Sequence, residues 1–410
     1  MEQLLFSLII AFLVFEFTMD LILDHLNKRA WSDAVPEVLS DIYDAVKFDK
    51  HKQYRGVNYS FGLVSDFIGF AATLIVLYSG ALAVADNWAL SIASHPVARG
   101  LIFFMIIGVA AALFQLPFSW YNTFVIEQKF GFNTTTKRTF WIDTLKSMLL
   151  SLLIGMPLMG LVIWLFQWVG DWFWFYAWLL ISGFTIFMSM FYTSWILPLF
   201  NKQSPLEAGS LRDAIEAFSR RAGFNLDNIF VMDGSKRSTK ANAFFSGLGS
   251  RKRIVLYDTL INDLTHDEIV AVLAHEVGHY KLKHTLWGTV AGIVQTGALL
   301  FVFSLFVSSP QLSQALGVDG VQFHIGLLAF GLLFSPISLI IGLLMNALSR
   351  HNEYAADHFA AVHADGQALV SALKKLSANS LGNPTPHAAY VWFHYSHPPL
   401  LQRMKALAKS

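Results

Sequence analysis

The sequence predicts a predominantly α-helical multi-pass membrane protein that carries a smaller α/β part. Three observations predict this fold class. Of the 410 residues, 55% are hydrophobic and only 14% are charged, whereas about 25% are charged in an ordinary soluble domain. The hydrophobic residues gather in seven runs, each near or above the ~20 residues that cross a bilayer core as a helix. Between the fifth and sixth runs lies a long polar segment with the patterns of both helices and strands.

The composition also limits the partners and the chemistry. Lys and Arg number 29 and Asp and Glu number 28, so the net charge of +1 gives no field that would steer a nucleic acid to the chain. The absence of Cys excludes disulfides, thiolate metal sites and thiol nucleophiles. With 14 His and no Cys, a transition-metal site has to use imidazole and carboxylate ligands.

The seven apolar runs are predicted to be transmembrane spans. They comprise residues 4–24, 61–84, 100–120, 146–168, 173–198, 286–308 and 324–348. None has a Lys or Arg in its middle, and the alternative, a soluble helical core, would require a polar face on each helix. Neighbouring helices in a membrane can accommodate Pro117, Pro157 and Pro336, which lie inside runs. No basic residues precede the first run and no small-residue cleavage site follows it, so we expect a span rather than a signal peptide.

The basic residues between the runs predict the orientation. Lys and Arg gather in 25–60, 121–145, 201–285 and 349–410, and they are absent from 85–98, 169–172 and 309–323. By the positive-inside rule the N-terminus lies outside and both large polar segments lie on the cytoplasmic side. We therefore expect a membrane region of five spans (1–200), a cytoplasmic α/β insert (201–285), spans six and seven (286–348) and a C-terminal part (349–410).

The insert is predicted to alternate helices and strands. An amphipathic pattern predicts a helix over 208–222. Apolar β-forming residues predict two strands with a glycine-containing turn region between them: 229–232 and 254–257, with Gly247 and Gly249. Thr265 then starts another helix, because Glu268 three residues later completes a capping box.

The helix that starts at Thr265 carries His275-Glu276-Val277-Gly278-His279. Four residues make slightly more than one helical turn, so the two imidazoles project from one face and can bind one metal ion. Glu276 is rotated ~100° from His275 and can reach a water molecule at the metal without binding the ion. A surface helix that happens to carry two histidines is the alternative.

A second pair of residues spaced by four follows the seventh run. A catalytic zinc ion needs three protein ligands and one open position, and Glu353 would supply the third ligand. Asp357 would accept the free N–H of a ligand histidine and so fix its tautomer. Taken alone, the two carboxylates also fit a solvated acidic pair after a membrane span. Together the two motifs predict a zincin-like α/β metalloprotease part on the cytoplasmic side that holds one Zn²⁺.

Three more polar residues are candidates for binding a substrate. His397, which precedes two prolines, and Arg403 could supply hydrogen bonds or charge where a tetrahedral intermediate develops its oxyanion. A His-Pro turn before an amphipathic helix is the alternative for this segment. Asn242, between the two predicted strands, could bind the substrate backbone or occupy a turn.

These segments together resemble the type I CAAX prenyl endopeptidase family of membrane-embedded zinc metalloproteases with seven spans. The resemblance covers most of the chain and rests on an ordered set of motifs. They are residues 124–133, 199–201, 204–206, 233–238, 242–244 with Gly247, 254–260, 275–279, 349–357 and 397–403.

The resemblance implies a role for each candidate residue. It implies zinc ligands at His275, His279 and Glu353, a general base and acid at Glu276, and peptide or oxyanion binding at Asn242, His397 and Arg403. It also implies that the spans enclose a large chamber with the zinc site at its cytoplasmic end. Two positions depart from the family's pattern. Many relatives have a His where this chain has Lys240, so the role of that His in substrate handling does not carry over, and Gln402 stands where relatives often have Glu.

The expected activity is zinc-dependent hydrolysis of peptide bonds, with removal of the C-terminal tripeptide that follows a prenylated Cys. A quality-control protease for membrane proteins, without a prenyl requirement, uses the same chemistry and is the alternative. A seven-span transporter or receptor is a more distant alternative, since the runs show no inverted repeat. The expected partners are a peptide or protein substrate and the lipid bilayer, with no nucleic acid, and we expect a monomer.

The expected location is a bacterial inner membrane or an endoplasmic reticulum membrane, with the active site on the cytoplasmic side. Two charged residues in the first run leave two interpretations open. Glu16 and Asp20 either line a chamber or lie near the hydrated interface, because charged groups in a span usually face protein or water.

Overall fold

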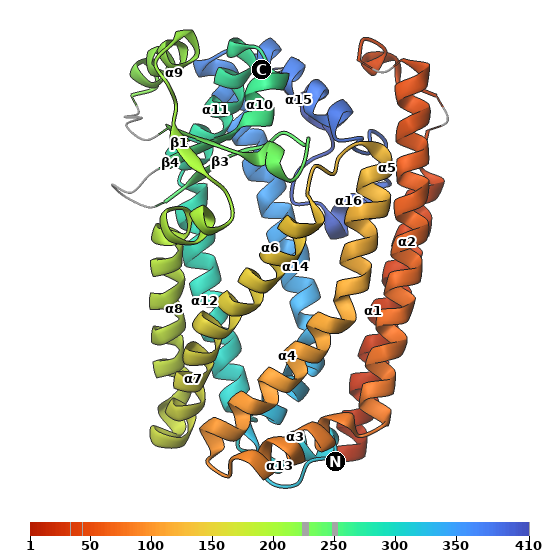
Figure 1. The fold of residues 1–410 in the computed structure, drawn as a ribbon, viewed down its shortest axis with the longest axis vertical. Coiled ribbons are helices and arrows are strands. Elements are labelled where there is room, and N and C mark those ends of the chain that lie inside the picture. Colours follow the sequence, from red (N-terminus) through yellow and green to blue (C-terminus); the bar gives the residue numbers. More distant parts are fainter. Residues whose placement is uncertain (33, 43, 224–228, 248–252, 410) are drawn as a thin grey trace.

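In the computed structural model, long helices stand side by side and a small α/β part covers one end of them (Figure 1). The structure describes residues 1–410 except 33, 43, 224–228, 248–252 and 410. Within the described residues seven helices are long and apolar enough to cross a membrane, which confirms the predicted fold class. They are Glu2–Arg29 (α1), Ala45–Tyr78 (α2), Pro96–Phe130 (α4 and α5), Lys137–Trp168 (α6 and α7), Gly170–Leu199 (containing α8), His284–Ser304 (α12) and Phe323–His363 (α14).

Three of these spans are interrupted by a π-helical turn, a feature that occurs mostly as single turns inside α-helices. The turns are Asn122–Glu127, Ser151–Gly155 and Tyr192–Ile196. They separate or end α4 (Pro96–Tyr121), α5 (Gln128–Phe130), α6 (Lys137–Leu150), α7 (Met156–Trp168) and α8 (Phe173–Phe191).

The second span differs from the predicted run 61–84. Helix α2 begins well before this run, because the Asp44 side chain caps it by accepting a hydrogen bond from the Lys47 N–H (2.7 Å). The helix ends before Gly80, whose left-handed backbone (φ 68°) allows a turn that side chains disfavour. A separate short helix, α3 (Ala81–Ile92), follows.

The seventh span runs further than the predicted run 324–348. Helix α14 continues to His363 and therefore carries Glu353 and Asp357. The boundary expected at 348/349 falls inside this helix. An alanine-rich continuation explains the length, since alanine has the highest helix propensity.

The α/β part holds a four-stranded sheet in the order β1-β2-β4-β3. Its strands are Gln203–Pro205 (β1), Ile229–Met232 (β2), Ala243–Ser246 (β3) and Arg253–Tyr257 (β4). The central strands β2 and β4 are the two that were predicted, and they pair in parallel with Ile229 opposite Ile254. The antiparallel edge strands β1 and β3 were not predicted. Of the two expected turn glycines, Gly247 has a left-handed φ of 94°, and Gly249 lies outside the described residues.

Six further helices at this end pack against the sheet, against one another or against the spans. They are Ser210–Arg221 (α9), Asp258–Asp263 (α10), His266–Lys281 (α11), Gly366–Asn379 (α15), Ala388–His394 (α16) and Leu400–Leu407 (α17). One buried apolar cluster joins strand, helix and span residues, among them Leu256 on β4, Leu273 on α11 and Ala360 on α14. The predicted capping box is present at Thr265. We call this end of the molecule, with β1–β4 and the helices named here, the sheet end.

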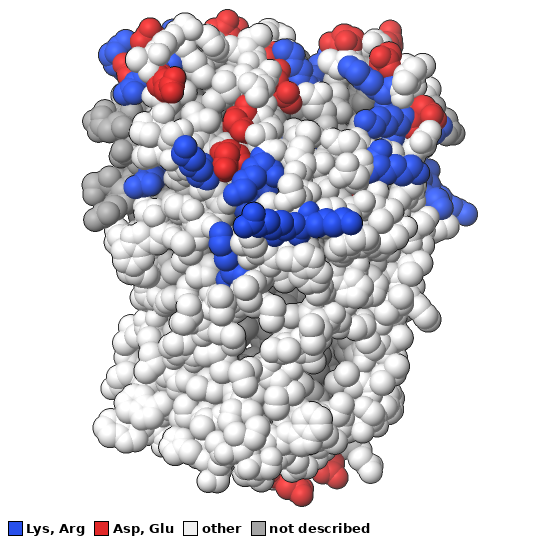
Figure 2. All heavy atoms as spheres, viewed as in Figure 1, with Lys and Arg blue, Asp and Glu red and all other residues white. Residues whose placement is uncertain are grey.

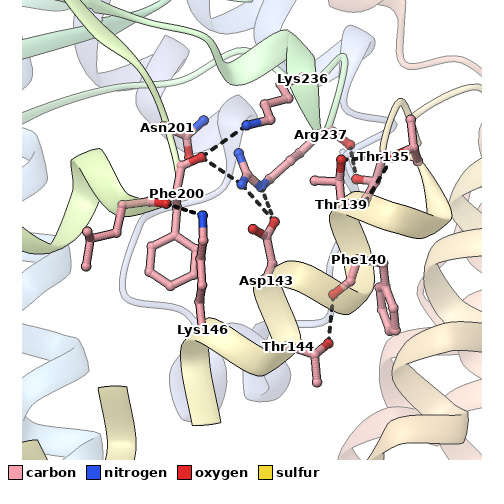
Figure 3. Close-up of polar contacts among 12 residues, drawn as sticks. Thr135, Thr139, Phe140, Asp143, Thr144, Lys146, Phe200, Asn201, Lys236 and Arg237 are labelled. Carbon is pink, nitrogen blue, oxygen red and sulfur yellow. Dashed lines mark hydrogen bonds and ion pairs between the residues drawn. The ribbon is translucent and has the colours of Figure 1, made fainter. Parts of the chain in front are cut away.

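Arg237 anchors the sheet end to two spans (Figure 3). Its guanidinium donates to Asp143 on α6 (2.8 Å) and to the carbonyl oxygen of Phe200 after the fifth span (2.8 Å). Lys146, one turn from Asp143, donates to the carbonyl oxygen of Leu199 (2.6 Å). These charge-assisted bonds fix the position of the sheet over the helix ends.

The opposite end of the molecule, which we call the far end, is formed by α3 and α13 (Pro310–Ala315) (Figure 1). There the buried Asp86 accepts hydrogen bonds from Arg99 on α4 and lies 2.7 Å from His324 Nε2 on α14. Burial acts to raise the pKa of Asp86, but the bonds from His324 and Arg99 outweigh it and lower the pKa. Three helices are thus joined at one carboxylate.

Charge is distributed unevenly between the two ends (Figure 2). On the face shown, lysines and arginines gather over the sheet end and in a band below it. The remaining half is uncharged except for acidic residues at its tip, and it is hollowed between the helices. This pattern is that of a hydrocarbon-facing belt with a basic rim.

Candidate metal centre

Helix α11 is held close against α14, and this contact brings the two predicted motifs together. Gly278 lies at the contact: a Cβ added there would be 3.2 Å from the Cα of Ala356 and 3.2 Å from the Cβ of Phe359. A larger residue would push the helices apart. Close packing of α11 against α14 therefore favours glycine at this position of the His275–His279 motif.

Three side chains converge between these helices. His275 Nε2 and His279 Nε2 lie 3.2 Å apart, and the carboxylate of Glu353 lies 3.5 Å from the first and 3.2 Å from the second. Donor atoms bound at about 2.0–2.1 Å to one tetrahedral zinc ion lie about 3.4 Å from one another. The three donors therefore fit one such ion. Among the described residues they are the only set of three metal-ligating side chains close enough to share one.

A buried aspartate orients one of these histidines. Asp357 Oδ1 lies 2.9 Å from His275 Nδ1, the ring nitrogen that faces away from His279. The same carboxylate accepts two bonds from Arg403, from Nε (2.8 Å) and from Nη2 (2.5 Å). Burial acts to lower the pKa of His275, but the Asp357 and Glu353 carboxylates raise it to about 9. The site thus favours a positive charge.

A cleft of about 140 Å³ opens beside the three donors, and the predicted residues meet there. Its lining includes Asn242, Glu276, His397 and Arg403. Within the described chain the Glu276 carboxylate has no hydrogen-bond or ion-pair partner, and burial raises its pKa. An unengaged carboxylate of raised pKa is suited to accept and return a proton.

The remaining candidates reach the cleft from separate elements. The ring of His397 is 65% exposed and its Nδ1 lies 2.8 Å from Glu353 Oε2. Arg403 is buried, and its Nη1 lies 3.7 Å from the same oxygen. Asn242 precedes β3, the edge strand next to α11, and its side chain accepts from the N–H of Ala243 (2.9 Å). The structure thus brings together the predicted metal-binding, catalytic and substrate-binding residues.

One neighbour of the site was missed by the sequence analysis. His284 Nδ1 lies 3.1 Å from His279 Nδ1, so one ring N–H donates to the other ring. A spacing of five residues does not place two side chains on one helix face, and only the left-handed backbone of Lys283 (φ 61°) returns the chain to His279. The sequence feature that could have indicated this contact was the presence of a histidine, His284, five residues after His279.

Of the two charged residues singled out in the first run, Asp20 lies near an ionisable side chain. Asp20 Oδ1 on α1 lies 3.8 Å from His394 Nε2 on α16, the helix that precedes His397. The Asp20 side chain, which is 56% exposed, thus lies beside α16. Lys240, at the position that departs from the family pattern, donates to Glu127 Oε2 (2.8 Å) and to the Tyr54 hydroxyl (3.1 Å).

Comparisons with known proteins agree with this architecture. Residues 24–202 match the family described as CAAX prenyl protease N-terminal, five membrane helices, and residues 205–410 match peptidase family M48. The chain is 36% identical to a CAAX prenyl protease 1 homolog of Dictyostelium discoideum over 92% of this chain and 89% of that protein. It is 32% identical to the human CAAX prenyl protease 1 homolog, over 99% and 96%. The crystal structure of S. mikatae Ste24p superposes with a TM-score of 0.93 at 33% identity, covering 98% of this chain and 99% of that one.

Proposed function

The chain belongs to peptidase family M48 and is a membrane-embedded metalloendopeptidase, and we propose that it uses a single zinc ion to cleave C-terminal CaaX tails that carry an isoprenoid. The proposed ligands are His275, His279 and Glu353. The observation that carries the proposal is the spacing of these three donors beside a cleft into which Glu276 projects.

The proposed chemistry needs no covalent intermediate. A zinc ion bound there would polarise the scissile carbonyl and make a water molecule acidic enough to react at neutral pH. Glu276 accepts the proton that the attacking water loses and returns it to the leaving amine. His397 and Arg403 supply positive charge or hydrogen bonds to the developing oxyanion.

The edge strand β3 offers the substrate a backbone to pair with. It borders α11, and its outer side has no strand partner among the described residues. An extended peptide can add to such an edge through main-chain hydrogen bonds. Asn242 at its start would then bind the peptide backbone near the scissile bond.

The CaaX substrate is supported by the names of the relatives and by the hollowed apolar half of the molecule (Figure 2). The test is mass-spectrometric mapping of cleavage by purified protein in lipid, with one CaaX peptide in farnesylated and unmodified form. Glu276→Gln serves as the blank. Cutting only the farnesylated peptide, directly after the modified Cys, is expected. Equal cutting of both peptides, or scattered cuts, would support a quality-control protease instead.

The identity of the metal has its own test. Elemental analysis of the purified protein should find one zinc per chain, and Glu353→Ala should remove it. Asp319→Ala, an exposed acidic change at the far end, is the matched control and should keep the metal. A fully metallated Glu353→Ala protein would exclude Glu353 as a ligand.

We also propose that the cleft lies on the cytoplasmic side, because the basic residues gather at the sheet end (Figure 2). The chain contains no Cys, so single cysteines report topology directly. An impermeant maleimide added to the cytoplasmic face should label Lys405→Cys and spare Asp319→Cys. The reverse pattern would invert the orientation.

A further inference from the structure

An apolar groove runs between α2 and α4 at the level where the spans meet the sheet end. Its volume is about 900 Å³, and its walls include Val64 on α2 with Pro117 and Tyr121 on α4. Lys28 and Lys129 line the same groove. It is separate from the cleft beside Glu276, with which it shares no lining residue.

The groove opens away from the interior of the molecule. Ser60 and Val64 line it, whereas Gly62 and Asp66 lie two residues further along, which on a helix is about 200° away and so on the opposite face. That opposite face is turned toward α16, since the Asp66 carboxylate interacts electrostatically with Asp20, whose Oδ1 lies 3.8 Å from His394 Nε2 on α16. Helix α16 packs against both α1 and α14, so this is the inner side of the ring of spans. The groove therefore faces the hydrocarbon of the bilayer.

Both lysines sit at the ends of their spans. Lys28 is the penultimate residue of α1 and Lys129 the penultimate residue of α5, the depth at which lipid headgroups lie. Neither ammonium has a carboxylate partner among the described residues: Lys28 Nζ lies 4.4 Å from the centre of the Tyr59 ring, and Lys129 Nζ lies 5.6 Å from that of Phe130. Two unneutralised cations thus stand at the polar end of an apolar groove.

We propose that this groove binds one anionic phospholipid, with its headgroup phosphate against Lys28 and Lys129 and an acyl chain along Val64 and Pro117. The charges match, because anionic headgroups attract basic residues next to a span. The apolar walls suit a hydrocarbon chain, which the bilayer supplies at this depth. An uncharged isoprenoid would have no electrostatic attraction to the two lysines.

The test is native mass spectrometry of the full chain in detergent, titrated with dioleoyl phosphatidylglycerol or dioleoyl phosphatidylcholine. We expect a saturable single adduct with phosphatidylglycerol that is at least tenfold tighter than with phosphatidylcholine. The double variant Lys28→Gln/Lys129→Gln should lose this preference, since one basic residue near an anionic surface contributes about fivefold in binding. The matched control Lys202→Gln/Lys405→Gln removes the same charge away from the groove and should bind as the parent does.

A third variant separates the groove from general surface charge. An added Cβ at Gly56, which lines the groove, meets no atom within 4 Å, so Gly56→Phe can fill the groove and leave both lysines in place. It should abolish the tight adduct. Unchanged binding in Gly56→Phe or in the double lysine variant, or displacement of the lipid by N-acetyl-S-farnesylcysteine methyl ester, would overturn the proposal.

Discussion

A buried aspartate holds a histidine and an arginine at each end of the molecule. The two triads are Asp357, His275 and Arg403 at the sheet end and Asp86, His324 and Arg99 at the far end. In both, the arginine Nε donates to the aspartate at 2.8 Å, and a histidine nitrogen lies within hydrogen-bond distance of the same carboxylate, at 2.9 Å and 2.7 Å respectively. The local chemistry is nearly the same.

The surroundings of the two triads differ. At the sheet end the second nitrogen of His275 meets His279 and Glu353 beside an open cleft. At the far end the ring of His324 packs against Phe103, with centroids 4.8 Å apart, and no second metal-ligating residue completes a site within the described residues. A buried triad thus orients a histidine, whereas reactivity requires further donors and an opening.

The largest expected effect comes from Glu276, which has no counterpart at the far end. Glu276→Gln should lower peptide hydrolysis by about 10²- to 10⁴-fold, the usual contribution of a general base, and leave the metal bound. The measurement is the turnover of a cleavable peptide, together with elemental analysis. Ordinary activity in this variant would show that the proposed proton transfer is wrong.

A substitution in the far-end triad should change the stability of the protein and leave metal binding unaltered. Asp86→Ala leaves Arg99 and His324 without their acceptor, and breaking a buried pair costs about 3–5 kcal/mol in the free energy of unfolding. Unfolding by SDS titration measures this loss, with the exposed Asp319→Ala as control. Loss of bound zinc from otherwise folded Asp86→Ala protein would contradict the separation of the two ends.

The sheet-end triad should act on the metal. Asp357→Asn removes the negative charge behind His275, and such partners are worth about 10- to 100-fold in metal affinity. Competition with a chelator measures the change. The same exchange at the far end, Asp86→Asn, should leave zinc affinity unaltered, so equal effects of the two variants would remove the distinction between the triads.

The smallest expected effect concerns the helix ends. Thr265 caps α11 through its side chain, whereas His95 at the start of α4 makes no side-chain cap bond. Thr265→Ala should cost about 1 kcal/mol of stability, and His95→Ala should cost much less. SDS titration of both variants decides this, and equal losses would refute the capping argument.

Much of the fold was predictable because its signals are local. Each apolar run requires a membrane or a core whatever its neighbours are, and seven of them appear as spans. The capping box at Thr265 also follows from residues within one turn. The edge strands β1 and β3 were not predicted, because three or four residues of mixed polarity show no strand pattern by themselves. They become strands only by pairing with β2 and β4.

In the candidate site, too, local spacing predicted some contacts and tertiary structure decided others. The spacing of four within each motif put His275 with His279, and Glu353 with Asp357, on single helix faces. The contact of His279 with His284 depended on one left-handed residue, Lys283, which the spacing rule does not consider.

By itself the sequence determined the span count, the motif helix and the residue types that a zinc site needs, because hydrophobic length and helical periodicity act over a few turns. Tertiary structure alone decided how these parts meet. It placed α11 against α14 at Gly278, and it joined Asp86 to His324 across 238 positions of the chain. Contacts between distant segments depend on packing, and packing is a property of the whole fold.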